Sequence, residues 1–566
     1  MTAQTSPPSP LHPGTFAPLR VPEYRRVWSG ALVSHLGTFL QLVAAPWLMN
    51  ELTSSPLLVA LVASALWLPR LVLTVPAGVL ADAFDRRAVL LAGQLFNAAS
   101  VTVLGVLTWQ DRVTPEGLLA LSLLLGMGTA VALPAYQTLL PDLVPPSLLA
   151  NAVTLNSAGF NVARALGPSI AGALVAAGQT ALAFFLNAAS YLVVVAVLLT
   201  IPREVTDATG RQPMLRSATT GFQYARFTRP IRIALAVTGA FALTAASVQS
   251  LLPTVVSADL GLGAAAFGLL YGGFGAGALV GAVTRERGRR IVAGRLILPL
   301  SIAGFGAAGV VFGLSRNAVL SAIALAFAGL FWVWTMTTLN ASVQMLAPRW
   351  VRGRVMSLYV MAAGLQPIGA FVAGVIAEFS GPGVAVACMT GATVVLGIYA
   401  RRLTLPVLDE IVMPAPPDDW TVAPHPIRVG GSPVAVVTTW RIDPDEIEGF
   451  LAAMRELRRH RLRTGARRWS LYRDAADPYR ISESFEVFDW DEHLAQHERI
   501  DADTAAAILR ARSFDRADGP VTVHLAGIDL LDGSLPIEQQ LLTVHEEYHE
   551  VDGSTPLRAA TPELER

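Results

Sequence analysis

The sequence predicts an all-α polytopic membrane protein with twelve transmembrane helices in two six-helix repeats, followed by a C-terminal cytoplasmic α+β domain of ferredoxin-like order. Three observations predict this fold class. Hydrophobic residues make up 53% and charged residues only 15% of the 566 residues, whereas about a quarter of a soluble domain is charged. A short loop occurs twice between apolar runs. After Asp418 the composition becomes that of a soluble protein.

A membrane-spanning helix needs about 20 apolar residues. The twelve qualifying segments are 27–50, 56–81, 88–109, 115–140, 150–177, 180–201, 231–257, 262–284, 291–314, 317–345, 354–379 and 382–400. The expected organisation is a cytoplasmic leader (1–22), an N-terminal six-helix half (23–202), a cytoplasmic linker (203–230), a C-terminal six-helix half (231–402), a Pro-rich linker (403–433), the α+β domain (434–530) and an acidic tail (531–566).

The repeated loop spans 78–87 in the first half and 281–290 in the second, and each copy has a Gly followed by an Arg pair. Matching loops indicate two homologous halves, which is the architecture of carriers with alternating access. Asp82 can pair with a cation or a helix N-terminus in one state and separate from it in the other. The predicted conformational latch consists of Gly78, Asp82, Arg86, Arg87, Arg289 and Arg290. The alternative is that these arginines only fix the topology.

The arginines near the span ends predict the orientation. One side carries Arg25 and Arg26, both Arg pairs of the repeated loops, the linker arginines and Arg401 with Arg402, whereas the other side has only Arg112 and Arg316. Basic residues concentrate on the cytoplasmic side of membrane proteins. We therefore expect both termini to be cytoplasmic.

The residue types exclude several chemistries. All 42 basic residues are Arg, so there is no lysine for a phosphate-binding loop or a Schiff base. Cys388 is the sole cysteine, which excludes an intramolecular disulfide. We expect no ATP hydrolysis, cofactor, metal or nucleic-acid partner. Transport energy would come from a gradient or from another protein.

Gly78, Asp82, Arg86 and Arg87 resemble the cytoplasmic loop signature G-x-x-x-D-[RK]-x-G-[RK]-[RK] of the major facilitator superfamily, although Ala83 and Asp85 depart from it. The segments 137–145 (QTLLPDLVP) and 156–172 (NSAGFNVARALGPSIAG) further resemble the efflux branch of transmembrane secretion effectors, which includes enterobactin-exporter-like proteins. This resemblance implies a secondary active exporter of a small amphipathic molecule such as a siderophore or a drug. It implies alternating access, proton coupling and a bacterial inner (plasma) membrane location.

The fifth predicted span resembles the signature helix of antiporters at Gly167, Pro168 and Gly172, with Ala163 and Ala171 in two glycine positions. In the family this helix is associated with export. Small residues let helices approach closely, and proline removes a backbone hydrogen bond. Ordinary small-residue packing is the alternative.

Charged and polar residues inside spans are costly and therefore usually functional. Arg70, Arg164, His35 and Gln41 are the predicted substrate or ion pathway. Internal structural pairing is the alternative for the arginines, and a structural hydrogen bond for His35. The carboxylates of the spans lie only at the span ends, whereas proton antiport usually needs a carboxylate inside the membrane. The proton as coupling ion is therefore implied by the resemblance alone.

The tail has the order β-α-β-β-α-β, with strands near 434–440, 469–473, 480–487 and 521–526 and helices near 443–463 and 491–512. It resembles the small barrels of antibiotic-biosynthesis monooxygenases and their non-enzymatic relatives. His493, His497, Trp469, Tyr472 and Trp490 offer polar and aromatic groups, but their spacing defines no site. His545–His549 matches H-E-x-x-H, where a solvated tail helix is favoured over a metal site.

The favoured hypothesis is a transporter that is not an enzyme, acting on a small molecule in the lipid bilayer, with a tail that dimerises or regulates. Two alternatives stay open. One is a membrane-anchored, cofactor-independent oxygenase whose chemistry lies in the C-terminal domain. The other is a regulatory or scaffold protein that does not transport.

Overall fold

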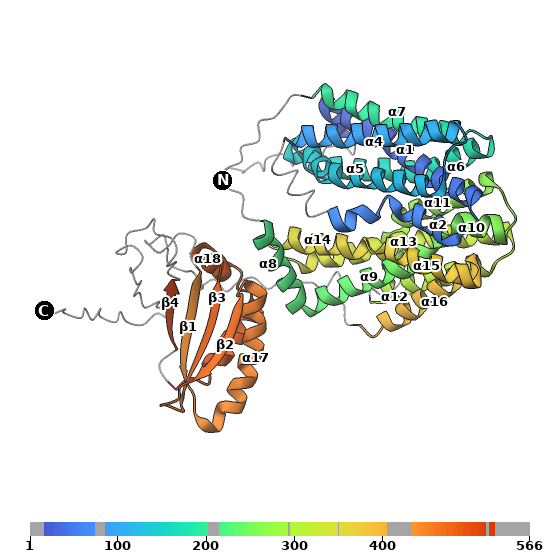
Figure 1. Cartoon of the computed structure of the whole chain (residues 1–566). Coiled ribbons are helices and arrows are strands. Elements are labelled where there is room, and N and C mark those ends of the chain that lie inside the picture. The colour runs from blue at the N-terminus through green and yellow to red at the C-terminus, as the bar shows by residue number, and fades with distance from the viewer. Residues whose placement is uncertain are drawn as a thin grey trace, which may run out of the picture. The chain divides into compact units, whose positions relative to one another are not determined.

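The computed structural model describes residues 16–73, 85–201, 214–291, 295–348, 350–403, 433–516 and 520–526. The chain forms two compact units. Unit 1 comprises residues 1–212, 233–343 and 357–409, and unit 2 comprises residues 213–232, 344–356 and 410–566. Unit 1 is an assembly of helices, and the strands all belong to unit 2 (Figure 1).

The first half of unit 1 contains α1 (Pro22–Leu52), α2 (Pro56–Ala65), α4 (Arg86–Trp109), α5 (Pro115–Asp142), α6 (Leu149–Ala176) and α7 (Thr180–Leu199). The second contains α9 (Arg229–Ser250), α10 (Leu252–Thr254), a π-helical turn (Val255–Asp259), α11 (Ala264–Ile291), α12 (Ile297–Leu314), α13 (Ala318–Leu346), α14 (Arg352–Ala363), α15 (Gln366–Ser380) and α16 (Pro382–Ala400). Within the described residues, ten helical segments are long and apolar enough to cross a membrane. The polytopic fold class is confirmed.

Prolines explain where single predicted spans divide into two helices. Proline lacks the N–H that would bond the carbonyl four residues earlier, and its ring clashes with that carbonyl. Accordingly α2 ends at Ala65, four residues before Pro69, and α14 ends at Ala363, four residues before Pro367. The predicted span 354–379 is confirmed as one membrane-long segment, Arg352–Ser380, with a short turn at 364–365. The predicted span 56–81 is described as far as residue 73 and contains a turn at 66–67.

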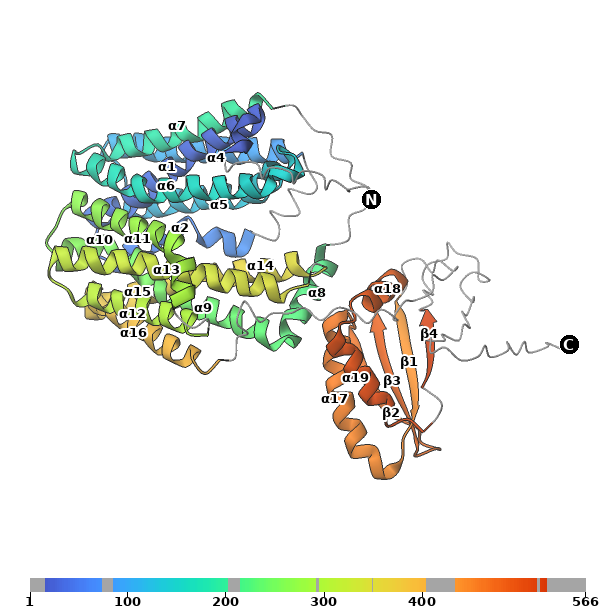
Figure 2. The same cartoon turned by 180° about the vertical axis from the view of Figure 1, so that it is seen from behind.

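Each half has its own packing core. In the first half Tyr24 is fully buried and donates a hydrogen bond of 2.8 Å to the carbonyl of Ala152, which ties α1 to α6. In the second half Trp332 of α13 lies 5.4 Å from Phe241 and 5.8 Å from Phe305, measured between ring centroids. These contacts join α9, α12 and α13. The two halves face one another along α6 and α11 (Figure 2).

Unit 2 contains an antiparallel sheet in the order β2-β3-β1-β4, which confirms the ferredoxin-like arrangement. Its strands are β1 (Val434–Arg441), β2 (Arg468–Arg473), β3 (Arg480–Val487) and β4 (Val521–Ala526). Its helices are α17 (Ile447–Thr464), α18 (Trp490–Glu498) and α19 (Ala502–Arg512). Alternate residues of β1 and β3 are buried, as expected when one face of a sheet is covered.

The single helix predicted over 491–512 is two helices. Asp501 begins the second one, because its side chain accepts a 2.9 Å hydrogen bond from the Thr504 N–H and thereby caps α19. Arg463 of α17 pairs with the same carboxylate at 2.6 Å. The Asp501 cap and its ion pair with Arg463 therefore fix a new helix start at a position where the apolar pattern predicted a continuous helix.

Unit 2 also includes α8 (Met214–Phe227), which lies within the predicted linker, and the segment joining α13 to α14. Phe227 packs against the tail core formed by Val434, Val436, Leu462, Ala466, Phe485 and Val487. The Arg499 guanidinium lies 4.3 Å from the centroid of the Trp350 ring, a cation–π distance. The α+β fold therefore packs on two connections of the second half.

Candidate transport site

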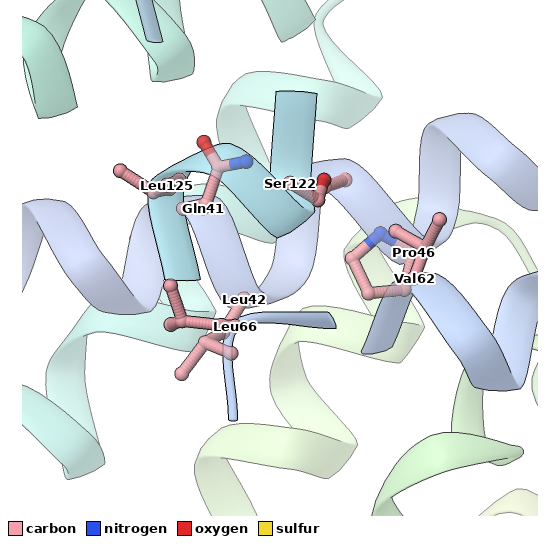
Figure 3. Close-up of a pocket in the computed structure, with 8 residues that line it drawn as sticks. Gln41, Leu42, Pro46, Val62, Leu66, Ser122 and Leu125 are labelled. Atoms are coloured by element: carbon pink, nitrogen blue, oxygen red, sulfur yellow. The ribbon is translucent and has the colours of Figure 1, made fainter. Parts of the chain in front are cut away.

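A small pocket opens between α1, α2 and α5 in the first half of unit 1 (Figure 3). It has about 240 Å³ of space that no atom fills, open solvent included, and its cavity volume is about 10 Å³, which is room for about one water molecule. The lining residues are Gln41, Leu42, Ala45, Pro46, Val62, Leu66, Ser122 and Leu125. Six of these eight are apolar side chains, so the pocket offers a hydrophobic wall with two polar groups. That lining is typical of small-molecule sites, but its cavity volume is far below the roughly 300–1,000 Å³ of such sites, so the helices have to separate before a drug-sized molecule can enter.

Gln41 and Ser122 are the polar groups of this pocket, and each is 4% exposed. Within the described residues, the amide nitrogen and oxygen of Gln41 have no hydrogen-bond partner. The Ser122 hydroxyl has none either. A buried polar group without a partner costs about 1–3 kcal/mol. Such a cost is retained where the group binds a ligand or water. Gln41 is a predicted pathway residue, whereas Ser122 was missed; its only sequence signal is a hydroxyl inside an apolar run.

The two predicted intramembrane arginines lie against aromatic rings. The Arg70 guanidinium carbon is 4.4 Å from the centroid of Trp67, and that of Arg164 is 5.4 Å from the centroid of Phe274. Phe274 belongs to α11 and Arg164 to α6, so the second contact crosses between the halves. Cation–π contacts partly compensate for the loss of hydration.

His35 of α1 also contacts an aromatic ring. Its ring centroid lies 5.2 Å from that of Phe160 in an edge-to-face arrangement, which joins α1 to α6. His35 and Gln41 share one helix, but only Gln41 lines the pocket. The structure therefore brings one of the four predicted pathway residues into this pocket.

The antiporter-like residues lie at close helix contacts. A Cβ added at Gly167 would lie 2.5 Å from the Cβ of Phe39 on α1. A Cβ added at Gly172 would lie 2.6 Å from the Cα of Gly268 on α11. Pro168 is buried inside α6 between them. These glycines are needed because any larger side chain would separate the helices.

The predicted latch falls only partly within the described residues. Gly78 and Asp82 lie outside them. Arg86 begins α4, and Arg289 with Arg290 lies near the end of α11. Arg87 donates a 3.2 Å hydrogen bond to the carbonyl of Leu199 on α7. Asp85, which departs from the family signature, accepts from the Arg87 N–H at 3.0 Å and caps α4.

The tail has a histidine cluster in which His493 is buried and His497 and His524 are half-buried. The spacing of His493 and His497 places both on one helix face, but it does not reveal His524. His493 and His497 approach to 3.3 Å between their Nε2 atoms, and His524 of β4 lies 4.6 Å from His493 between ring centroids. Burial lowers the pKa of His493 to about 2 and that of His497 to about 4. Trp490 packs on this cluster, 5.2 Å from His493, whereas Tyr472 is 60% exposed.

Glu483 is a second buried group on the inner face of this sheet and is 0% exposed. Its Oε1 accepts a 2.8 Å hydrogen bond from Trp469 Nε1 and pairs with Arg461 Nε at 3.4 Å. Within the described part of the chain, no three His, Cys, Asp or Glu residues are placed to hold a metal ion. The H-E-x-x-H segment, His545–His549, lies outside the described residues.

Paired helical halves, half-buried arginines within the spans and a pocket with two polar groups are features expected of a membrane transporter. The profile of the transmembrane secretion effector family matches residues 13–528, and the chain belongs to that family of major facilitator transporters. It is therefore a multi-pass membrane transporter rather than an enzyme. The match extends through β4 of the tail domain.

Three curated relatives illustrate the family. The chain is 26% identical over 377 residues to the staphyloferrin A transporter of Staphylococcus aureus, covering 64% of this chain and 93% of that protein. It is 26% identical to the multidrug efflux pump Tap of Mycolicibacterium fortuitum, covering 68% of this chain and 96% of that protein. It is 27% identical to the enterobactin exporter of Citrobacter koseri, covering 70% and 95%.

Two solved structures share the fold. The nucleoside transporter NupG aligns over 67% of this chain and 99% of its own, with a TM-score of 0.57 and 12% identity. The second structure is a bacterial homologue of the human lysosomal transporter Spinster in an inward-facing and unoccupied conformation. It aligns over 70% of this chain and 98% of its own, with a TM-score of 0.53 and 16% identity. At these identities the likeness concerns the fold alone.

Proposed function

We propose that this transporter is a secondary exporter that moves a small amphipathic molecule, of the siderophore or drug class, from the cytoplasm or inner leaflet to the outside. The observation that carries the proposal is the apolar pocket in which the buried Gln41 amide and Ser122 hydroxyl have no hydrogen-bond partner among the described residues. A polar group of an amphipathic substrate would satisfy them while its apolar part contacts Leu42 and Leu66. Three relatives bearing siderophore or efflux names support the substrate class.

We further propose that the protein lies in the bacterial inner membrane with both termini cytoplasmic and exchanges substrate for protons. The arginine asymmetry supports the orientation. The contact of α6 with α11 at Gly172 supports movement of the halves as close-packed bodies. The chain has no lysine for a phosphate-binding loop, which leaves a gradient or another protein as the energy source, and of these we propose the proton gradient.

The test is efflux from proteoliposomes containing the purified full-length protein, with a compound panel that includes catecholate and carboxylate siderophores and amphipathic drugs. Transport of at least one class should rise with an imposed pH gradient. Gln41→Ala should lower it roughly tenfold, as loss of a hydrogen bond to a buried partner predicts. Ser157→Ala, an exposed serine of α6, is the matched control. Equal efflux with and without a pH gradient would contradict proton coupling. Unchanged efflux by Gln41→Ala would contradict the assignment of this pocket as the substrate site.

For the tail we propose a regulatory or dimerising role. Its core includes Phe227 of α8, and its Arg499 stacks on Trp350. Phe227 and Trp350 lie on connections that adjoin helices of the second transport half in sequence, which supports a role of the tail in regulating that half. Truncation after Arg402 tests the role. Retained efflux with changed substrate dependence supports regulation, and complete loss of efflux in a correctly inserted protein contradicts it.

A further inference from the structure

One stretch of the tail concentrates positive charge. Residues 455–468 contain seven arginines and a single acidic residue, and they cover the second half of α17 and the start of β2. Inside the domain Arg461 pairs with Glu483. Arg463 pairs with Asp501. The other five arginines are exposed and are called here the basic face: Arg455, Arg458, Arg459, Arg467 and Arg468.

The charge of the basic face is largely uncompensated. Among the described residues, Arg468 is the one member with a carboxylate partner, Glu486 at 3.4 Å. Its side chain is 80% exposed and that of Glu486 37%, so this ion pair contributes little. Arg467 lies over an aromatic ring instead, 3.9 Å from the centroid of Phe488. The face therefore presents guanidinium groups that are available to an external anion.

The five arginines share one edge of the domain. Residues three and four apart lie on the same side of a helix, so Arg455, Arg458 and Arg459 lie together on α17. The guanidinium carbon of Arg458 is 5.8 Å from the centroid of Trp469 in β2, the edge strand beside α17 (Figure 1). The two remaining arginines immediately precede Trp469 in the chain. Helix and edge strand thus form a continuous basic surface.

This surface lies at the end of the domain that contacts α8. Phe227 of α8 packs against the tail core at Leu462 and Ala466. Leu462 follows Arg459 by three residues, which is about one helical turn. Ala466 is directly followed by Arg467. The contact with α8 therefore holds the basic face close to the connection that leads into α9.

Two membrane spans begin inside the same compact unit as the tail. Unit 2 includes residues 213–232 and 344–356. The candidate span Arg229–Asp259 starts in the first of these segments, and Arg352–Ser380 starts in the second. Phe227, which packs on the tail, is two residues from the first span. Unit 2 is thus held where these spans enter the membrane, within reach of lipid headgroups.

We propose that the basic face docks on anionic phospholipid headgroups of the membrane that carries the protein. Guanidinium groups bind phosphate oxygens through paired N–H donors. Each arginine near an anionic bilayer surface strengthens binding by about fivefold, and the attraction fades within a Debye length of about 8–10 Å. Docking fixes the tail beside the start of two spans, which gives anionic lipid a route to regulate the carrier. In the proposed orientation the headgroups are those of the inner leaflet, and in this respect the inference rests on the proposed function.

Arginine footprinting of the full-length protein in lipid nanodiscs tests the docking. Phenylglyoxal modifies accessible guanidinium groups, and mass spectrometry of the peptides gives the modification rate at each arginine. The rates are compared between nanodiscs of phosphatidylcholine alone and nanodiscs with about 30% phosphatidylglycerol, an anionic lipid. The basic face should react roughly tenfold more slowly in the anionic nanodiscs, and about 0.5 M salt should restore the rates.

Arg441, Arg473 and Arg480 are the matched control within the same molecule. They are exposed and lie at the opposite end of the sheet, because β1 pairs with β3 from Val434 with Val487 at one end to Arg441 with Arg480 at the other. The Val434–Val487 end carries the core that packs on α8. The control arginines should change their rates by less than about twofold between the two nanodiscs, since they lie beyond a Debye length from the docked face.

Two triple variants separate the basic face from net charge. The first removes the helix arginines and should abolish the protection of Arg467 and Arg468. The second removes the control arginines, with the same change in charge, and should keep that protection. The substitutions are Arg455→Gln, Arg458→Gln and Arg459→Gln in the first, and Arg441→Gln, Arg473→Gln and Arg480→Gln in the second.

Equal rates for the basic face in the two nanodiscs overturn the proposal, as does equal protection of the control arginines. Protection that appears only when polyglutamate or a short RNA is added assigns the face to another polyanion and also overturns it. If the first variant does not fold, the footprint of the unsubstituted protein and its salt dependence decide. Absent efflux in proteoliposomes with lipid-dependent protection refutes the export proposal and leaves the docking, whereas normal efflux with unprotected arginines refutes the docking alone.

Discussion

Gly172 of α6 and Gly268 of α11 pack backbone against backbone at the contact between the two halves. A Cβ on either residue would lie 2.6 Å from the Cα of the other. The same glycine-lined side of α11 meets α6 again at Gly272 and Gly275. Helices in membranes gain stability from such close approach, because lipid provides little hydrophobic drive for association.

Gly172→Val should therefore force α6 and α11 apart and lower transport at least about tenfold while the protein still inserts, since overpacking a close contact costs about 1–3 kcal/mol. Efflux in proteoliposomes and detergent thermal unfolding are the measurements. Gly273→Ala is the matched control, because a Cβ there meets nothing within 4 Å. Normal transport by Gly172→Val would show that the contact is not needed during the cycle.

Gln41→Leu should separate stability from function. The substitution removes a buried amide that has no hydrogen-bond partner among the described residues, so the free energy of unfolding should rise by about 1 kcal/mol. Transport should fall because the substrate loses a hydrogen-bonding group. Ser64→Ala is the control: its hydroxyl already donates to the Ala60 carbonyl at 2.9 Å, so its loss should give no gain in stability. Reduced stability in Gln41→Leu would mean that the amide is satisfied in the folded protein.

The tail should lose stability below neutral pH. The pKa of His497 is lowered to about 4 by burial and then by Arg461 and His524, from an ordinary value of about 6.5. The unfolded chain therefore binds more protons between these values, and the stabilising contribution, complete above about pH 6.5, falls as the pH drops toward 4. We expect a loss of about 2 kcal/mol between pH 7 and pH 5 for this imidazole.

Hydrogen exchange of β1 and β3 in the full-length protein at the two pH values measures this change. His497→Leu should flatten the dependence, and His493→Leu should flatten it further, because burial also lowers the pKa of His493 to about 2. An undiminished pH dependence in the double variant would assign the effect to other groups.

The face of the tail sheet that the described residues leave uncovered carries exposed apolar residues on β4, where Val521 is 65%, Val523 38% and Leu525 46% exposed. If the tail dimerises, this face is the natural contact. Val523→Glu should then lower the dimer fraction roughly tenfold in analytical ultracentrifugation, whereas Arg468→Glu on the opposite edge strand β2 should not. A monomer at all concentrations would leave regulation through α8 as the tail's role.

The sequence by itself determined the two helical halves, the soluble tail and its strand order, because apolar run length and period-two alternation are local properties of the chain. It also pointed to Gly172, Pro168 and Gln41 as unusual residues in their helices. Only the tertiary structure decided which groups meet. Ser122 reaches Gln41's pocket from α5, His524 reaches His493 from another strand, and Glu378 caps a helix 323 positions away in sequence. Such contacts depend on how helices pack across the whole fold, and no local spacing encodes them.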